Sequence, residues 1–447
     1  MNSRAMTRRR LLATLPLAAA SKIPTYATTP DNGESVLQAG ELATVAGLRF
    51  STSPTVRLGF IGVGRRGMAL LDNFLAVDGV RVAAICDLSA AQTRAARAMA
   101  EKAGSSSPQL YSGGASDFEN LCRRDDIDLV VVATPWSWHA RMALCAMKQG
   151  RHVAVEVPMA TSVEDCWRLV HTSEQCRRHC IMFENCCYGY NELLMLNMVR
   201  DGRLGELTHG AGGYLHDLRA RFTLGTEQPW MREEYVRRNG NLYPTHGLGP
   251  IASYMGINRG DRFDSLVSLS SRGSSFSLIH PSPPAFRCGD QNTSIIKTSN
   301  GLLITLEHNV SSPEPYDRLN MIAGTRGIFR DFPARLFLDG ETTADTWETL
   351  DRHKAKYEHR LWSLVGPKRR ESAGHEAMDY VMCYRLVECM RAGLAPDMDV
   401  YDGAAWSAAG PLSEMSVASG GAVVPFPDFT RGAWRQTALG IQSSRLR

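Results

Sequence analysis

The chain has 447 residues, of which 44% are hydrophobic and 21% are charged, and its formal net charge at pH 7 is +4. This length predicts two or three domains, each large enough to bury a core, and beyond the N-terminal segment no apolar run is long enough to span a bilayer. The small net charge gives no indication of a nucleic-acid partner.

Residues 1–27 have the features of a twin-arginine export signal. Thr7–Leu12 reads TRRRLL, Leu11–Ala20 is a short apolar region, and the small residues at Ala18–Ala20 and Ala27 offer cleavage points. The segment holds five basic residues and no acidic one, so its removal would change the net charge from +4 to −1. We therefore expect a periplasmic or secreted bacterial protein that meets the twin-arginine export machinery; a basic disordered tail is the alternative.

Eleven cysteines are scattered along the chain, several of them within apolar stretches. Twin-arginine export carries folded proteins, so cysteines buried in the cytoplasm would stay reduced. Cys176, Cys180, Cys186 and Cys187 form a cluster, but no histidines follow at zinc spacing. We interpret the cluster as packing residues and expect no bound metal.

The stretch from Val56 to Asp87 has the order of a dinucleotide-binding unit: apolar strand, glycine-rich turn, helix, second apolar strand and acidic residue. In the turn, Gly62 permits the bend, Gly64 lets the backbone approach a pyrophosphate, and Gly67 lets the helix pack closely on the strand. Asp87 is placed to accept hydrogen bonds from a ribose 2′-hydroxyl, and Leu and Ser, not a basic residue, follow it. The stretch therefore predicts NAD rather than NADP.

Alternating strands and helices continue to residue 183 and predict a doubly wound parallel sheet, in an α/β domain at residues 55–183 that follows a linker at residues 28–54. Strands are expected at Leu58–Ile61, Val80–Cys86, Ile127–Ala133, His152–Val157 and Ile181–Glu184, and helices at Ser89–Ala103, Ala115–Arg124, Trp138–Lys148 and Ser162–His179.

Residues 184–447 predict a second domain of α+β class, with an open, mostly antiparallel sheet and helices packed on one face. Strand-like runs separated by Gly, Ser and Pro turns occur at Leu207–His216, Arg262–Ser270, Thr293–Lys297, Leu302–Asn309 and Gly327–Phe332. Helices are expected at Tyr190–Arg200 and Gly374–Arg391, and little pattern is visible from Val423 onward.

Ligands of doubly wound sheets bind at the carboxyl ends of the strands, and three polar segments fall there. Ala133–His139 (ATPWSWH) follows one strand, Glu156–Pro158 ends the next, and Glu184–Asn185 ends the one after. Trp136 and Trp138 are placed to line the binding site of a nicotinamide ribose. The alternative is that they cover the edge of the sheet.

Two motifs resemble those of the Gfo/Idh/MocA oxidoreductases. One is the strand that ends in Ala-Thr-Pro, with Trp136 and His139 beyond it, and the other is the E-x-P of Glu156–Pro158. The resemblance implies NAD(P) bound to an N-terminal Rossmann domain and a sugar or polyol bound on the sheet of the second domain. Most members have lysine inside E-x-P, where it assists hydride transfer. This chain has Val157, which cannot carry a proton, so an ordinary dehydrogenase mechanism is not expected.

Four blocks in the second half of the chain indicate a particular family within this superfamily: Gly213–Arg219, Trp230–Arg232, Asn239–Pro250 (NGNLYPTHGLGP) and Met255–Asp261. They are similar to glycoside hydrolase family 109, which contains NAD-dependent α-N-acetylgalactosaminidases, and E-V-P fits that subgroup. The resemblance covers nearly the whole chain. The long NGNLYPTHGLGP block is its most specific part.

The resemblance also implies site residues. Besides the glycine motif, NAD would contact Arg65, Arg66, Asp87, Trp136, Ser137, Trp138, His139, Glu156, Val157 and Asn185. The sugar would contact Tyr214, Trp230, Arg232, Tyr243, Pro244, Thr245, His246 and Tyr316. By contrast His209, His216 and His308 lie within strand-like runs and are expected to be structural or to support the binding residues from behind.

The segment Tyr243–His246 is expected to form a turn, because Pro244 fixes its own φ and holds Tyr243 extended. Gly247 and Gly249 would let the chain turn tightly afterwards. A phenol and an imidazole can then point into one cavity, and histidine is suited to proton transfer near neutral pH. We predict Tyr243 and His246 as the catalytic pair; a core histidine bonded to backbone is the alternative.

A redox cofactor in a glycosidase predicts oxidation at C3 of the sugar, elimination, water addition and re-reduction, because NAD-dependent families are exceptions to the two-carboxylate mechanism. The expected partner is a small glycoside or glycan terminus, with no nucleic acid and no stable membrane anchor; a homo-oligomer is compatible with the sequence. A net NAD-dependent sugar oxidoreductase and a non-catalytic binding protein are the alternatives. The sugar, its anomer and the division of roles between Tyr243 and His246 stay open.

Overall fold

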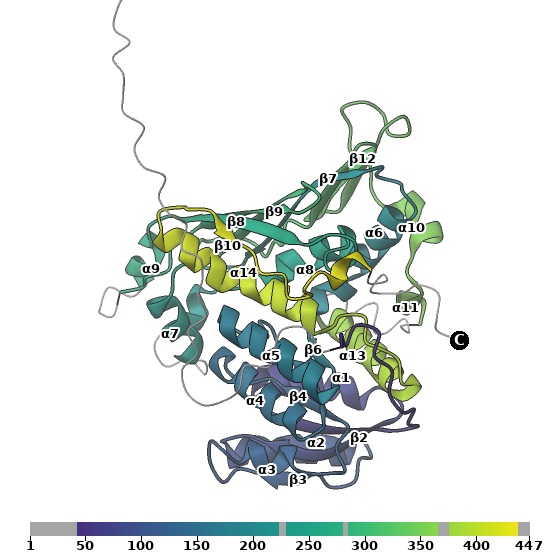
Figure 1. Ribbon diagram of the computed structural model, residues 1–447, viewed down its shortest axis with the longest axis vertical. Helices are drawn as coiled ribbons and strands as arrows, with labels where there is room; N and C mark the ends of the chain where they lie inside the picture. Colours follow the sequence, from purple (N-terminus) through teal and green to yellow (C-terminus); the bar gives the residue numbers. More distant parts are fainter. Residues whose placement is uncertain (1–42, 223–228, 280–284, 365–374, 437–447) are drawn as a thin grey trace, which may run out of the picture. The chain divides into compact units, whose positions relative to one another are not determined.

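The structure is a computed structural model that describes residues 43–222, 229–279, 285–364 and 375–436 (Figure 1). The expected signal at residues 1–27 lies outside the described residues. Everything described belongs to one compact unit of the chain, which begins at Leu42. Among the described residues, no helix combines the length and hydrophobicity needed to cross a bilayer.

The first part of the chain forms a six-stranded, fully parallel sheet with the order β3-β2-β1-β4-β5-β6. Every residue of the central strands β4 and β5 is buried, because helices cover both faces, and this explains their uninterrupted apolar sequence. The predicted doubly wound sheet is confirmed. Its strands are β1 (Val56–Ile61), β2 (Val80–Cys86), β3 (Gln109–Tyr111), β4 (Leu129–Val132), β5 (His152–Val155) and β6 (Cys180–Met182).

Five helices connect these strands, and two of them begin at serine caps. Ser89 accepts the Gln92 N–H and starts α2, and Ser162 accepts the Asp165 N–H and starts α5. The fourth helix starts at Trp136, two residues earlier than expected, so both tryptophans of the ATPWSWH segment lie in its first turn. The helices are α1 (Arg65–Leu75), α2 (Ala90–Lys102), α3 (Phe118–Cys122), α4 (Trp136–Lys148) and α5 (Val163–Cys176).

The second part forms an eight-stranded sheet with the order β13-β12-β11-β7-β10-β9-β8-β14. All its strand pairs are antiparallel except β7 with β10, which confirms an open, mostly antiparallel sheet. The short strands β11, β13 and β14 were not expected from the sequence. The strands are β7 (Leu207–Leu215), β8 (Phe263–Ser270), β9 (Asn292–Thr298), β10 (Leu303–Asn309), β11 (Met321–Gly324), β12 (Gly327–Arg330), β13 (Arg335–Leu338) and β14 (Val424–Pro425).

The helical elements of this part include several that sequence periodicity did not reveal. They are η1 (Asn185–Tyr188), α6 (Tyr190–Arg200), η2 (Arg219–Phe222), α7 (Pro229–Arg237), α8 (Thr245–Tyr254), α9 (Ser274–Ile279), α10 (Asp351–Tyr357), α11 (Arg360–Ser363), α13 (His375–Ala392), α14 (Val400–Ala418) and η3 (Ala433–Arg435).

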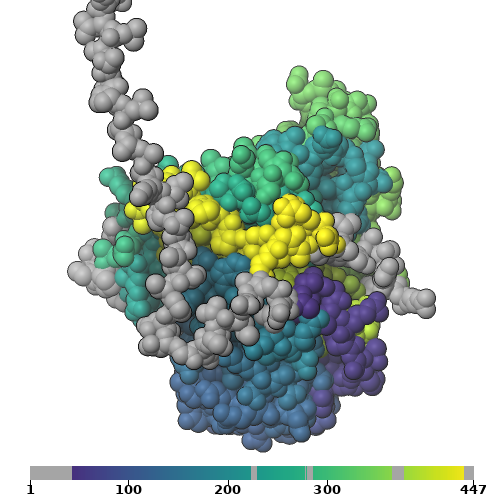
Figure 2. All heavy atoms as spheres, viewed as in Figure 1, coloured from purple at the N-terminus to yellow at the C-terminus, as the bar shows by residue number. Residues whose placement is uncertain are grey.

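Helix α14 joins the two sheets. It packs on α5 and β6 of the first part and on β8 of the second. Figure 2 shows this end of the chain, in yellow, lying between the blue and teal parts of the surface. Most of its nineteen residues are buried, so its apolar residues do not repeat on one face and the sequence carries no amphipathic signal for it.

The lead-in, which we expected to be a linker, packs on the first part in its described portion. The Val45 side chain is buried, and the Val45 N–H donates to the Tyr401 hydroxyl at 3.2 Å. Farther along, the Phe50 N–H donates to the Gly393 carbonyl, just beyond α13. Residues 43–54 therefore connect the first sheet with the C-terminal helices.

The expectation of a turn at Tyr243–His246 is wrong in part, because Thr245 and His246 are the first residues of α8. Pro244, with φ −73°, is the N-cap of this helix. Gly247 does not bend the chain. A Cβ there would lie 2.2 Å from the Gly213 nitrogen, so the glycine lets α8 lie directly on strand β7. This close approach places the first turn of α8 beside the end of the parallel sheet.

Candidate active site

A cavity of about 900 Å³ lies at the carboxyl ends of the parallel strands and is lined by residues of both parts of the chain. Its lining includes most of the residues expected at the site: Gly62, Gly64, Arg65, Arg66, Asp87, Trp136, Trp138, His139, Glu156, Val157, Tyr214, Trp230, Tyr243, His246 and Tyr316. Gly67, Ser137, Asn185, Arg232, Pro244 and Thr245 lie outside the lining.

The glycine-rich turn has the geometry that a pyrophosphate requires. Gly62 has φ +87°, which favours glycine, and a Cβ on Gly67 would lie 2.0 Å from the Gly62 carbonyl oxygen. Around Gly64 nothing lies within 4 Å of where a Cβ would be, so the backbone is open to a ligand at the start of α1. The turn therefore fits a dinucleotide.

Asp87 is held in place by two backbone donors at the end of β2. The Val63 N–H donates to its Oδ2 at 2.9 Å, and the Ser89 N–H donates to its Oδ1 at 2.8 Å. A carboxylate has about four acceptor positions, so the remaining two can accept ribose hydroxyls. The neighbouring side chain, Leu88, is 71% exposed and apolar, which matches an adenosine without a 2′-phosphate.

The first turn of α4 forms one wall of the cavity. Trp136 is buried, with its ring centroid 5.4 Å from that of Trp230 and 5.6 Å from that of Tyr243. It therefore joins the two parts of the chain and does more than cover the sheet edge. Trp138 lies under the Arg141 guanidinium at 5.2 Å. Ser137, between the two tryptophans, is exposed.

His139 is buried behind this wall and holds two loops together. Its Nε2 lies 2.7 Å from the Thr134 carbonyl and its Nδ1 lies 2.8 Å from the Pro158 carbonyl. Burial lowers the pKa of His139, and these carbonyl contacts only partly offset that effect. The ring therefore stays neutral at neutral pH and donates to one carbonyl at a time.

Arg66 is the centre of a partly buried ionic network between α1, the end of β5 and α13. Its Nε donates to Glu156 Oε1 at 2.7 Å, its Nη2 donates to Asp379 Oδ1 at 2.9 Å, and its Nη1 donates to Asp379 Oδ2. The Asn185 amide donates to the same Asp379 Oδ1 at 2.8 Å. Burial opposes the charge of Arg66, but the two carboxylates outweigh it and raise its pKa well above the ordinary value. Asn185 thus acts on this network from behind the cavity wall.

Sequence reasoning missed Asp379. The residue lies in α13, far along the chain from the Rossmann motif, and is 2% exposed. The signal available in the sequence was an isolated acidic residue on an otherwise apolar face of a helix.

Aromatic side chains of the second part form the opposite wall. The Tyr214 ring centroid lies 4.5 Å from that of Tyr243 and 6.0 Å from that of Tyr316. Burial raises the pKa of all three phenols, so they stay protonated at neutral pH. Flat apolar rings that carry hydroxyl groups suit the face of a sugar ring.

His216 lines the cavity and supports Tyr214, so of the two alternatives that the sequence left open it is not purely structural. Its Nδ1 lies 3.0 Å from the Tyr214 hydroxyl, and its ring centroid lies 4.9 Å from that of Tyr316. His308 is buried against the Tyr235 hydroxyl at 3.2 Å, as a structural histidine would be. Arg232 lies over the Phe286 ring at 5.4 Å rather than in the cavity wall.

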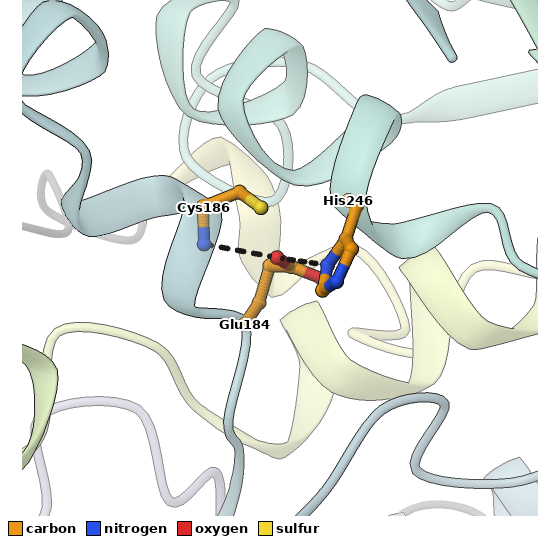
Figure 3. Close-up of side chains that lie close together, drawn as sticks. All are labelled: Glu184, Cys186 and His246. Atoms are coloured by element: carbon orange, nitrogen blue, oxygen red, sulfur yellow. Dashed lines mark hydrogen bonds and ion pairs between the residues drawn. The ribbon is translucent and has the colours of Figure 1, made fainter. Parts of the chain in front are cut away.

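His246 and Glu184 form a buried hydrogen-bonded pair beside the cavity (Figure 3). Glu184 Oε1 lies 2.7 Å from His246 Nδ1, and the Cys186 N–H donates to the same oxygen at 3.1 Å. The side chains of Glu184, Cys186 and His246 offer ligand atoms within 4.8 Å of one another. However, two ligands on one tetrahedral zinc would be about 3.3 Å apart, given Zn–N and Zn–O distances near 2.0–2.1 Å. The 2.7 Å separation is that of a hydrogen bond.

The cavity has the two halves of a nucleotide-dependent carbohydrate enzyme: a dinucleotide turn on a parallel sheet and an aromatic wall on an open sheet. Residues 56–184 match the model of the oxidoreductase family with an NAD-binding Rossmann fold, the Gfo/Idh/MocA class. Residues 188–436 match the model of the glycosyl hydrolase 109 C-terminal domain. The chain belongs to glycoside hydrolase family 109.

Relatives agree with this assignment, and solved structures share the fold. The chain is 55% identical to a glycosyl hydrolase family 109 protein of Solibacter usitatus, over 89% of this chain and 93% of that protein. It is 42% identical to an alpha-N-acetylgalactosaminidase of Shewanella oneidensis, over 96% of this chain and 95% of the other. A levoglucosan dehydrogenase in complex with NADH and levoglucosan shares the fold, with a TM-score of 0.68 at 17% identity over 83% of this chain and all of that one. The protein is a glycosidase built on the Gfo/Idh/MocA fold, with NAD as its cofactor.

Replacement of Asp87 by alanine should release the cofactor. The purified protein is expected to carry NAD, because a cofactor that is regenerated in each turnover has no need to dissociate. Asp87→Ala removes the acceptor for the ribose hydroxyls, while Asp72→Ala, on an exposed face of α1, should retain NAD. The measurement is the nicotinamide released on denaturation. Equal nicotinamide contents in the two variants would contradict the assignment of Asp87.

Replacement of Asp379 by asparagine should weaken both folding and NAD retention. Removal of one partner from a buried ion pair typically costs about 3 kcal/mol, and Arg66 itself belongs to the glycine-rich motif and lines the cavity. The control is Asp126→Asn, which removes a 2.7 Å pair with Arg124 at the surface. The melting temperature and the NAD content should both fall in Asp379→Asn and stay near the wild-type values in the control. An unchanged melting temperature in Asp379→Asn would show that the network is not needed.

Proposed function

We propose that this enzyme cleaves terminal N-acetylgalactosamine, or a related hexose, from glycosides by oxidation at C3, elimination of the C1 substituent, addition of water and re-reduction. The main support for this proposal is the pairing of Glu184 with His246. The pair orients a histidine base toward a cavity whose other end fits NAD. The name of the Shewanella relative supports the choice of sugar. The glycine-rich turn and Asp87 would hold NAD⁺, which when bound would supply the redox chemistry of hydride removal from C3 and its return to the same carbon.

His246 is proposed as the base that takes the C2 proton. A ketone at C3 makes that proton acidic, and His246 Nδ1 is committed to Glu184, so Nε2 is the ring nitrogen that acts on the substrate. After the C1 substituent has left and water has added at C1, the same nitrogen returns the proton to C2. The C3 hydroxyl proton and the proton for the leaving group are exchanged with water.

Tyr243 is proposed as the hydrogen-bond donor to the C3 oxygen. Its ring centroid lies 4.9 Å from that of His246. Burial, with smaller contributions from Tyr214 and two carboxylates, raises the pKa of Tyr243 well above its ordinary value, so it remains a phenol. A phenol can stabilise the negative charge that develops on the C3 oxygen when the C2 proton leaves. We propose this division of roles, which the sequence left open.

Val157 favours a hydrolase over a net oxidoreductase. It is buried in the cavity wall, where most relatives of the wider superfamily have lysine, and it cannot exchange protons with a hydroxyl group. A transient ketone that is reduced again in the same site does not require that lysine. The proposal includes the roles of the cofactor-binding residues, the sugar-binding residues and the catalytic pair named above.

The test combines a panel of nitrophenyl α- and β-glycosides of N-acetylgalactosamine, galactose and N-acetylglucosamine with turnover in D₂O. We expect cleavage of the α-N-acetylgalactosaminide, with deuterium at C2 of the released sugar and none at C3, measured by proton NMR. His246→Ala should retain NAD but lose about 10²–10⁴-fold in kcat, the usual contribution of a general base. Full retention of the C2 proton would indicate direct displacement, and accumulation of NADH would indicate a net oxidoreductase.

We also propose that the protein is exported, already folded, by the twin-arginine machinery. All eleven cysteines are free and most are buried, as expected for a chain that folds in a reducing compartment. A joint Arg8→Lys and Arg9→Lys change should leave the protein in the cytoplasm of a bacterium that has this machinery, because lysine does not reproduce the paired arginines. Arg4→Lys is the control. Periplasmic recovery of the double variant at the control level would contradict export by this route.

A further inference from the structure

The Glu184 side chain lies at a junction of three elements. Glu184 follows β6, caps the first turn of η1 through the Cys186 N–H, and contacts His246 in the first turn of α8. It is 0% exposed, and His246 is 4% exposed. Burial of a carboxylate costs free energy unless the group is paired and hydrogen-bonded.

The space for this carboxylate is built into α8. A Cβ on Gly249 would lie 2.9 Å from Glu184 Cγ and 3.0 Å from Cys187 Sγ, so the helix approaches Glu184 and η1 closely only because this residue is glycine. Gly247 brings the same helix against β7. The first turn of α8 is therefore held between β7 and the segment that begins at Glu184, and Glu184 contacts the His246 ring directly.

The charge state of the pair follows from the groups around it. Burial alone would raise the pKa of Glu184, but the charge and hydrogen bond of His246, together with the Thr245 hydroxyl and the Cys186 N–H, outweigh it and lower the pKa. The other titratable groups facing the ring are the Cys186 thiol and the Tyr214 and Tyr243 phenols, and burial raises the pKa of each. Of these groups, only Glu184 is ionised at neutral pH.

We infer that Glu184 is a positioning residue that orients His246 and selects its tautomer. An ionised carboxylate only accepts, so Nδ1 carries the ring hydrogen and the lone pair of the neutral ring lies on Nε2. When Nε2 takes a proton, the carboxylate at 2.7 Å stabilises the resulting imidazolium. The inference rests on the proposed function, in which His246 is the C2 base.

The experiment compares Glu184→Gln, Glu184→Asp and a matched control, Glu174→Gln. Glu174 is another fully buried carboxylate of the Rossmann part, bonded to the Tyr401 hydroxyl and Arg431 and outside the cavity lining. We expect Glu184→Gln to retain NAD and KM but to lose about 10²–10⁴-fold in kcat, as for the carboxylate of a catalytic triad. Glu184→Asp, which keeps the charge, should recover part of kcat. Glu174→Gln should affect stability but not kcat.

The pH dependence separates positioning from a merely structural role. Loss of a negative neighbour disfavours the imidazolium, so the acid limb of the kcat profile should move to lower pH in Glu184→Gln. A wild-type kcat and pH profile in Glu184→Gln, or losses that only follow its folded fraction, would overturn the inference. Stoichiometric zinc in the wild type, with kcat lost on chelation, would also overturn it by assigning Glu184 as a ligand.

A spectroscopic measurement makes the result independent of glycosidase activity. In protein labelled with ¹⁵N-histidine, His246 should show the Nδ1–H tautomer with a strongly downfield proton, identified by its loss in His246→Gln. That signal should move or vanish in Glu184→Gln and persist in Glu174→Gln. If the wild type cleaves no glycoside but the signal behaves in this way, the proposed function fails while the positioning role stands. If the signal is unaffected by Glu184→Gln, the positioning role fails.

Discussion

The guanidinium of Arg66, held between Glu156 and Asp379, is the interaction on which the geometry of this enzyme most depends. It ties the first turn of α1, beside the glycine-rich turn, to the end of β5 in the same sheet and to α13 near the end of the chain. Chemistry between a nicotinamide and a sugar requires the two walls of the cavity to keep a fixed separation. A partly buried charged network is a means of fixing that separation.

Close backbone contacts through glycine serve the same purpose on the other wall. Gly247 lies against Gly212 and Gly213, so α8 and β7 are nearer than side chains would allow. Gly249 in turn makes room for Glu184. His246 therefore belongs to a helix that lies on β7 through main-chain contact and packs on the Glu184 and Cys187 side chains beyond β6.

The electrostatics of the cavity divide its polar groups into two kinds. The tyrosines are kept protonated by burial and can donate hydrogen bonds, while the ionised carboxylates are paired with Arg66 or His246. Val157, buried in the cavity wall, cannot exchange protons with a hydroxyl group. Under the proposed mechanism, proton transfer is therefore assigned to His246 of α8, at C2 of the sugar.

The sequence by itself determined the Rossmann sheet, the glycine-rich turn, Asp87 and the family, because these depend on local order: strand, turn, helix, strand and acid within about thirty residues. It also indicated that Tyr243 and His246 lie near each other, since only two residues separate them. Only the tertiary structure decided that their segment begins a helix, that α14 joins the sheets, and that Asp379 and Glu184 stand behind the reacting groups. Those outcomes depend on contacts between residues as far apart as Arg66 and Asp379, or on helices buried on all sides, and neither leaves a periodic pattern in the chain.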